Sequence, residues 1–122
     1  MNEKSVFGLS PNAAAALSYV LGPLTGIAVM VMERENKFVR FHALQSTLWF
    51  LMLLVIGWVL SLMMGLPIPI LGFLLNLVLS PVYFIGTLVY FFSKFFLIWK
   101  AYQGSKFKIP IFGNVAWAQV NK

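Results

Sequence analysis

The polar side chains that could do chemistry in this chain are few, and most of them fall in one stretch, KFVRFHALQS, at residues 37–46. This stretch contains the only histidine, His42, followed by Gln45 and Ser46. On a helix of about 3.6 residues per turn these three side chains share one face, whereas Arg40 lies about 160° from His42. The spacing predicts a small polar cluster facing other helices, with Arg40 directed at lipid headgroups instead.

Enzymatic chemistry needs a paired acid and base, an activated nucleophile or a metal site. The chain has one histidine, three acidic residues and no cysteine, and no acidic residue follows Glu35. We therefore predict a non-enzymatic protein with no catalytic residue, no metal site and no cofactor. A contact from His42 to Glu33 or Glu35 is conceivable, but hydrogen-bonded packing is the commoner role of a histidine at a membrane boundary. A transporter acting alone is disfavoured, since coupled transport usually needs an intramembrane carboxylate.

The composition indicates which elements must position these residues. Of the 122 residues, 61% are hydrophobic, 16% are aromatic and only 10% are charged, which is far outside the range of soluble domains. The net charge of +6 is concentrated at the ends of apolar runs. That distribution suits anionic lipid headgroups and excludes nucleic acid, whose binding requires a solvated basic face.

Long apolar runs predict an all-α integral membrane protein with three transmembrane helices. The predicted spans cover residues 12–32, 41–64 and 70–94. An interfacial basic and aromatic tail, residues 95–122, completes a single membrane domain of residues 1–122. The third span contains Pro81, and we expect one helix kinked there because a separate ten-residue segment would be too short to cross.

Local signals mark where these helices begin and end. Ser10 followed by Pro11 predicts the start of the first helix, and Asn36 is a candidate N-cap for the second. Gly104 is placed as a C-cap of the third helix. Pro23, inside the first span, predicts a kink there, unless Ser18 or Thr25 satisfies the freed backbone group.

Small residues recur every fourth position in each predicted span and would let helix backbones approach closely. The positions that we assign to helix packing are Ser18, Gly22, Gly26, Gly57, Ser61 and Gly72. Asn76 is the one strongly polar side chain deep in the third span. We expect it to make an interhelical hydrogen bond rather than to contact a substrate.

Basic residues predict the orientation of the chain. The residues expected to meet lipid headgroups are Arg34, Lys37, Lys94, Lys100, Lys106 and Lys108. Because cytoplasmic segments carry an excess of lysine and arginine, the first loop and the tail are both predicted to be cytoplasmic. Three spans then place the N-terminus outside. The tail, in which aromatic residues alternate with lysines, would lie on the membrane or fold back on the helices.

Four motifs carry a resemblance to a known family. RFHALQS at 40–46, AYQG at 101–104 and FKIPIFGNVA at 107–116 accompany the LGPLTGI segment of the first helix. Together they resemble small prokaryotic membrane proteins of unknown function grouped with the chloroplast inner-envelope import component "Tic twenty". The resemblance covers about residues 17–116. It implies a multi-helix protein of a prokaryotic cell membrane related to a translocon subunit, although the plastid proteins are described with four membrane helices.

These observations favour a helical membrane module that acts in membrane protein assembly or translocation. Its expected partners are membrane lipids and other membrane protein subunits or copies of itself. Two alternatives remain open at this point: a small oligomeric channel or carrier, and a membrane regulator that binds anionic lipid.

Overall fold

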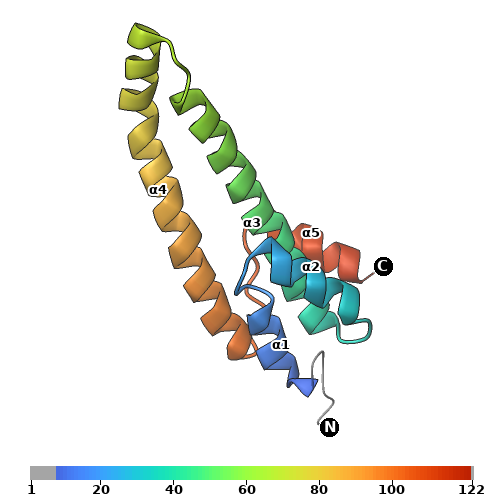
Figure 1. Ribbon diagram of the computed structural model, residues 1–122. Helices are drawn as coiled ribbons and strands as arrows, with labels where there is room; N and C mark the ends of the chain where they lie inside the picture. The colour runs from blue at the N-terminus through green and yellow to red at the C-terminus, as the bar shows by residue number, and fades with distance from the viewer. Residues whose placement is uncertain (1–7, 122) are drawn as a thin grey trace.

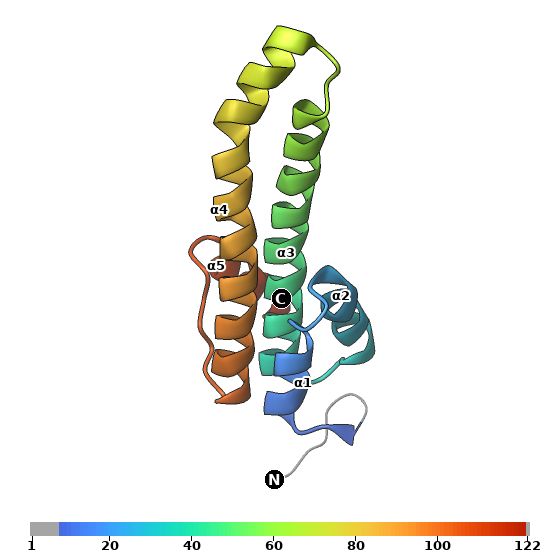
Figure 2. The same cartoon turned by 60° about the vertical axis from the view of Figure 1, so that its left-hand side comes forward.

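The computed structural model describes residues 8–121, and this part of the chain is helical without strands. The helices are α1 (Pro11–Leu17), α2 (Pro23–Met32), α3 (Lys37–Met64), α4 (Pro69–Tyr102) and α5 (Phe112–Val120). Helices α3 and α4 form a long antiparallel hairpin, while α1, α2 and α5 gather around the end where α3 begins and α4 finishes (Figures 1 and 2). We call this end the base of the hairpin.

The boundaries of the long helices follow from local chemistry. The Asn36 side chain accepts a hydrogen bond from the Val39 amide at 3.1 Å, as predicted for an N-cap. Helix α4 runs without interruption through Pro81, which confirms one helix rather than two segments. Beyond its end Gly104 adopts a φ of 85°, the left-handed conformation that glycine favours after a helix.

Two helices of the described chain, α3 and α4, are long and apolar enough to cross a membrane. At 28 and 34 residues they extend roughly 42 and 51 Å, more than the ~30 Å of a hydrocarbon core. Only 6% of the most apolar 18-residue window of each helix is buried within the chain, so neither is the core helix of a soluble protein. The prediction of three spans is therefore wrong, and two candidate spans replace them.

The first predicted span, residues 12–32, fails to form one helix because the chain turns back between α1 and α2. Gly22 has φ 64° and ψ −128°, a conformation that only glycine adopts without strain, and Pro23 then begins α2. The expected kink at Pro23 is thus a complete break. Thr25 helps to satisfy the turn, since its hydroxyl donates to the Ser18 carbonyl at 3.2 Å and accepts from the Leu21 amide. Helix α2, about 15 Å long, is too short to cross.

The short helices place both ends of the described chain at the base (Figure 1). Helix α1 packs against α4, and a Cβ atom added to Gly104 would lie 3.2 Å from the side-chain amide of Asn12. Any membrane that the hairpin crosses would thus have the beginning of α1 and the end of α4 on the same side. An outside start combined with an inside end, as predicted from three spans, does not fit this arrangement.

Candidate functional site

Three buried polar side chains meet where α3 passes the turn between α1 and α2. Tyr19, His42 and Gln45 are all 0% exposed. The Tyr19 hydroxyl lies 2.6 Å from His42 Nδ1, and Gln45 Nε2 donates to that hydroxyl at 2.8 Å. His42 Nε2 lies 2.9 Å from the carbonyl oxygen of Ser105. We call these three side chains, together with the neighbouring buried Ser46 on α3, the polar cluster.

The partners fix the direction of every bond in this chain of hydrogen bonds. The Ser105 carbonyl can only accept, so His42 Nε2 carries a proton and donates. With the ring neutral, Nδ1 accepts from the Tyr19 hydroxyl, whose oxygen accepts from Gln45. Burial raises the pKa of the Tyr19 phenol far above its usual value, and the hydrogen bond from Gln45 opposes this only in part. Tyr19 is therefore a permanent O–H donor under physiological conditions.

Gln45 also holds the segment that follows α4. Its Nε2 donates to the Phe107 carbonyl at 3.0 Å, and its Oε1 accepts from the Ile109 amide at 2.8 Å. Together with the bond from His42 to Ser105, these contacts fix residues 105–109, which we call the tail strap. The tail thus folds back on the helices, one of the two predicted alternatives.

Ser46, the last member of the cluster, satisfies the backbone of the turn between α1 and α2. Its hydroxyl lies 2.6 Å from the Ser18 carbonyl and 3.3 Å from the Gly22 carbonyl. Residues Ser18 and Gly22 therefore belong to a turn bound by α3 rather than to a continuous packing stripe. Ser18 and Ser46 are 0% exposed, so this contact matters because a buried carbonyl without a donor is costly.

The structure brings His42, Gln45 and Ser46 together but places Arg40 and Asn76 elsewhere. Arg40 Nη1 donates to the Glu33 carbonyl at 2.6 Å and to the Met30 carbonyl at 3.3 Å, so it caps the C-terminal end of α2. At the opposite end of the hairpin, Asn76 Nδ2 donates to Met64 and Gly72 carbonyls and closes the turn between α3 and α4.

The remaining residues assigned to packing are Gly26 on α2, Gly57 and Ser61 on α3, and Gly72 on α4. A Cβ atom on Gly26 would lie 2.6 Å from Thr47 Oγ1, which shows that α2 and α3 are in close contact. Gly72 similarly faces the Leu66 carbonyl. Gly57 and Ser61 line a space between α3 and α4, and a Cβ atom on Gly57 would lie 3.9 Å from the Tyr83 ring.

The basic residues lie mainly around the base. Among those predicted to meet lipid, Arg34, Lys37, Lys106 and Lys108 are exposed, while Lys94 and Lys100 are half-buried. Lys106 Nζ lies 4.0 Å from the centroid of the Trp117 ring, so the tail strap also contacts α5. Lys37 Nζ donates to Asn121 at 3.2 Å and joins the start of α3 to the end of α5.

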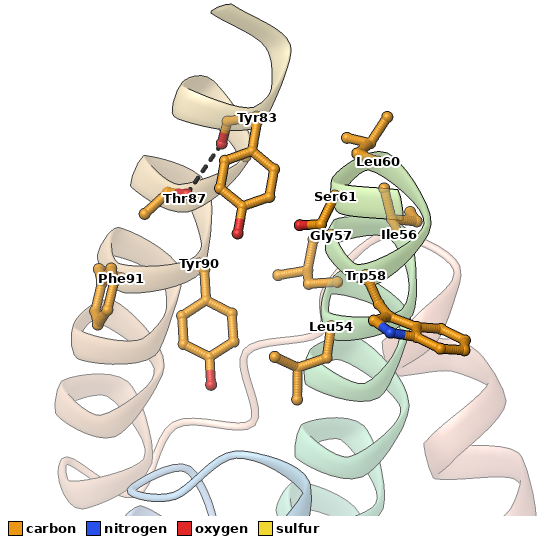
Figure 3. A pocket seen from close by; sticks show the side chains of 12 residues that line it. Leu54, Ile56, Gly57, Trp58, Leu60, Ser61, Tyr83, Thr87, Tyr90 and Phe91 are labelled. Carbon is orange, nitrogen blue, oxygen red and sulfur yellow. Dashed lines mark hydrogen bonds between the residues drawn. The ribbon is translucent and has the colours of Figure 1, made fainter. Parts of the chain in front are cut away.

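A groove of about 520 Å³ separates α3 from α4 beyond the polar cluster. Its α3 wall includes Leu54, Gly57 and Ser61, and its α4 wall includes Tyr83 and Tyr90. Figure 3 shows both tyrosine rings directed from α4 toward α3 across this space. The groove is lined predominantly by apolar side chains.

Comparison with known proteins identifies the family. Residues 6–116 match the magnetosome magnetite crystal formation protein family, MamF/MmsF. The chain belongs to this family. It is also 42% identical to a UPF0132 membrane protein of Archaeoglobus fulgidus over 112 residues, which are 92% of this chain and 97% of the relative. A UPF0132 membrane protein of Methanocaldococcus jannaschii is 39% identical over 113 residues, covering 93% and 91% of the two chains.

The MamF/MmsF match and the archaeal relatives establish a family of small membrane proteins, in agreement with the composition. They show no link to the chloroplast import component that the motifs resemble. No solved structure matches the chain.

In this MamF/MmsF family member the side chains of the RFHALQS motif hydrogen-bond to two segments that are distant in sequence. Its side chains bind the turn before α2 and the tail strap, which are separated by more than 80 positions in sequence. Sequence reasoning missed Tyr19 and the backbone groups of Ser105, Phe107 and Ile109. The sequence could have indicated Tyr19, because a tyrosine within an apolar run usually has a hydrogen-bond partner for its hydroxyl. No sequence feature could have indicated the backbone groups.

Proposed function

We propose that the chain is a non-enzymatic membrane module whose α3–α4 hairpin crosses a prokaryotic cell membrane twice and associates there with copies of itself or with larger membrane proteins. The observation that carries the proposal is the exposure of the hairpin, since 6% of each apolar window is buried within the chain. The polar cluster, by contrast, is fully used by contacts inside the chain. Association of apolar helix faces is therefore the activity that this surface offers.

A role in the assembly or translocation of membrane proteins is the finer form of this proposal, supported by the resemblance of the motifs. The family description refers to magnetite crystal formation in magnetosomes. Metal ions are held mainly by carboxylate, imidazole and thiolate groups, and the chain has three acidic residues, one histidine and no cysteine. We therefore favour a scaffolding role over direct contact with mineral. A channel or carrier would need several copies, because two spans cannot enclose a pore.

The base of the hairpin is proposed to be cytoplasmic, because the exposed basic residues gather there. The chain has no cysteine, so single cysteines can replace Asn12, Glu35, Leu66 and Gln103, which are all exposed. An impermeant thiol reagent applied to intact cells should label position 66 and leave the other three protected. Labelling of positions 12 and 35 from opposite sides would restore a third span and contradict the hairpin.

Association is tested by cysteine crosslinking in native membranes. Exposed positions on different faces of the hairpin, such as Leu62, Phe73 and Val78, are replaced one at a time. A specific interface should give crosslinks at positions on one face and not on another, with a defined mass for the crosslinked species. Uniform absence of crosslinks, together with a monomer that retains no membrane protein partner in mild detergent, would refute the association.

A further inference from the structure

Lys94 places a positive charge at the end of the groove nearest the base. Its Nζ lies 4.9 Å from the ring centroid of Tyr90 and 5.9 Å from that of Phe91, and both residues line the groove. The sequence has no acidic side chain after Glu35, which precedes α3. Phe50, which also faces Lys94, follows Lys37, the first residue of α3, by a helical rise of about 20 Å. Glu33 and Glu35, the acidic side chains among the described residues, both precede α3 and lie far from Lys94.

The position of Lys94 along α4 matches the depth of a lipid headgroup. It follows Pro69, the first residue of α4, by a helical rise of about 37 Å. If the turn between α3 and α4 lies at one membrane surface, a ~30 Å hydrocarbon core ends close to Lys94 on the other. Tyr90, one turn deeper, then lies where tyrosines commonly occupy the membrane interface. The groove continues from Tyr90 past Gly86 to Tyr83, within the hydrocarbon.

We propose that this groove binds one anionic phospholipid, with the headgroup phosphate at Lys94 and an acyl chain between α3 and α4. The charge of Lys94 attracts the phosphate, and the cation does not have to give up its contacts with the aromatic rings. The Tyr90 hydroxyl makes no hydrogen bond within the described residues and can donate to an ester carbonyl of the lipid. The acyl chain lies between the apolar walls of the groove, whose volume is within the range of small-molecule sites.

A lipid fits this combination better than a transmembrane helix does. A helix crossing the membrane satisfies its own backbone and offers apolar side chains at this depth, so it would leave Lys94 and the Tyr90 hydroxyl without acceptors. An anionic lipid supplies a negative charge, ester oxygens and an apolar chain in the order in which the groove presents their partners. The site is independent of the proposed association, which uses outward faces of the hairpin.

The headgroup contact is tested on the full chain purified in mild detergent, with phosphatidylglycerol or phosphatidylcholine added and bound lipid counted by native mass spectrometry. Lys94→Gln should weaken phosphatidylglycerol binding roughly fivefold and weaken phosphatidylcholine binding less, because the cationic choline offsets the charge of the same phosphate. Lys100→Gln is the matched control, because Lys100 lies on the same helix over the rings of Phe96 and Trp99, outside the groove. Equal losses in the two variants would overturn the site in favour of general surface attraction.

The acyl contact is tested by filling the groove. A Cβ atom added to Gly86 meets nothing within 4 Å, so Gly86→Leu should occupy the groove without disturbing the fold. Binding of both lipids should fall several-fold, whereas Ile85→Leu, at an exposed neighbouring position, should bind as the unaltered chain does. Unchanged lipid binding in Gly86→Leu would overturn the proposal, and a simultaneous change in oligomer mass would assign the groove to a helix. Lipid binding by a strictly monomeric chain would support the site while the association fails.

Discussion

Replacing Gln45 by leucine should release the tail strap. The amide of Gln45 is held in one orientation, because the Phe107 carbonyl can only accept and the Ile109 amide can only donate. Leucine has a similar size but neither group. The bond to the Tyr19 hydroxyl is lost as well, although that hydroxyl keeps His42 as its acceptor.

The loss in the free energy of strap opening depends on which backbone partners of Gln45 can bind water instead. Ile109 is 7% exposed, so its amide would be left buried and unsatisfied at a cost of about 1–3 kcal/mol. Phe107 is 36% exposed and its carbonyl can be hydrated, so that bond contributes less, about 0.5–1.5 kcal/mol. We expect the free energy of strap opening to fall by about 2–3 kcal/mol. At 2 kcal/mol the open population rises about 30-fold.

Limited trypsin digestion measures this opening, because Lys106 and Lys108 are exposed within the strap. When opening is fast relative to cleavage, the cleavage rate follows the open population, so Gln45→Leu should be cut at these sites about 30-fold faster. Gln119→Leu, on the exposed side of α5, is the control and should change the rate little. Equal rates in Gln45→Leu and the control, with the chain still folded, would refute the role assigned to this amide.

Two further predictions concern the packing of α2 and the titration of the cluster. Gly26→Ala should lower the free energy of unfolding by about 1–3 kcal/mol, since the new methyl group would lie 2.6 Å from Thr47 Oγ1. Gly86→Ala, whose methyl group would enter open space, should raise the free energy of unfolding by about 0.5–1 kcal/mol. Denaturant unfolding in detergent measures both changes. Tyr19 has a raised pKa, so its contribution to stability is full below pH ~10, where the unfolded phenol is neutral, and declines as the pH rises further. Tyr19→Phe should have a flatter stability profile above pH 10, and an identical alkaline slope in both chains would contradict this assignment.

The helix ends were predictable because their causes are local. Ser10 accepts from the Ala13 amide, Asn36 accepts from the Val39 amide, and Gly104 takes the left-handed conformation. Each signal lies within four residues of the boundary that it marks. The continuity of α4 through Pro81 followed from length, since the alternative left a segment too short to cross.

The path of residues 12–32 could not be predicted in the same way. Apolar composition and length suit a crossing helix and a helix pair that turns back equally well. One feature that stabilises the turn comes from outside this segment, because the Ser46 hydroxyl on α3 lies within hydrogen-bond distance of the Ser18 and Gly22 carbonyls. A hydrogen bond between residues so far apart leaves no periodicity in either segment, and a proline after glycine is compatible with a kink as well as a break.

The polar cluster was half predictable for a related reason. The helical period places His42, Gln45 and Ser46 on one face, but it does not identify what that face contacts. Two of the contacts made by Gln45 are to backbone atoms of the tail strap, and every residue has such atoms. The side chains of Phe107 and Ile109 therefore contain no indication that their main chain meets an amide.

The lone histidine shows why a titratable residue near a membrane boundary is weak evidence for transport. Both ring nitrogens of His42 are engaged, one with the Tyr19 hydroxyl and the other with the Ser105 carbonyl. A second proton on the ring would turn Nδ1 into a donor, and the Tyr19 hydroxyl would then face two donors and lose the acceptor for its own proton. Proton uptake at this position would thus disrupt the contact between α3 and Tyr19, whereas the bond from Nε2 to the Ser105 carbonyl would remain. The geometry therefore gives His42 the role of a structural hydrogen-bonding residue.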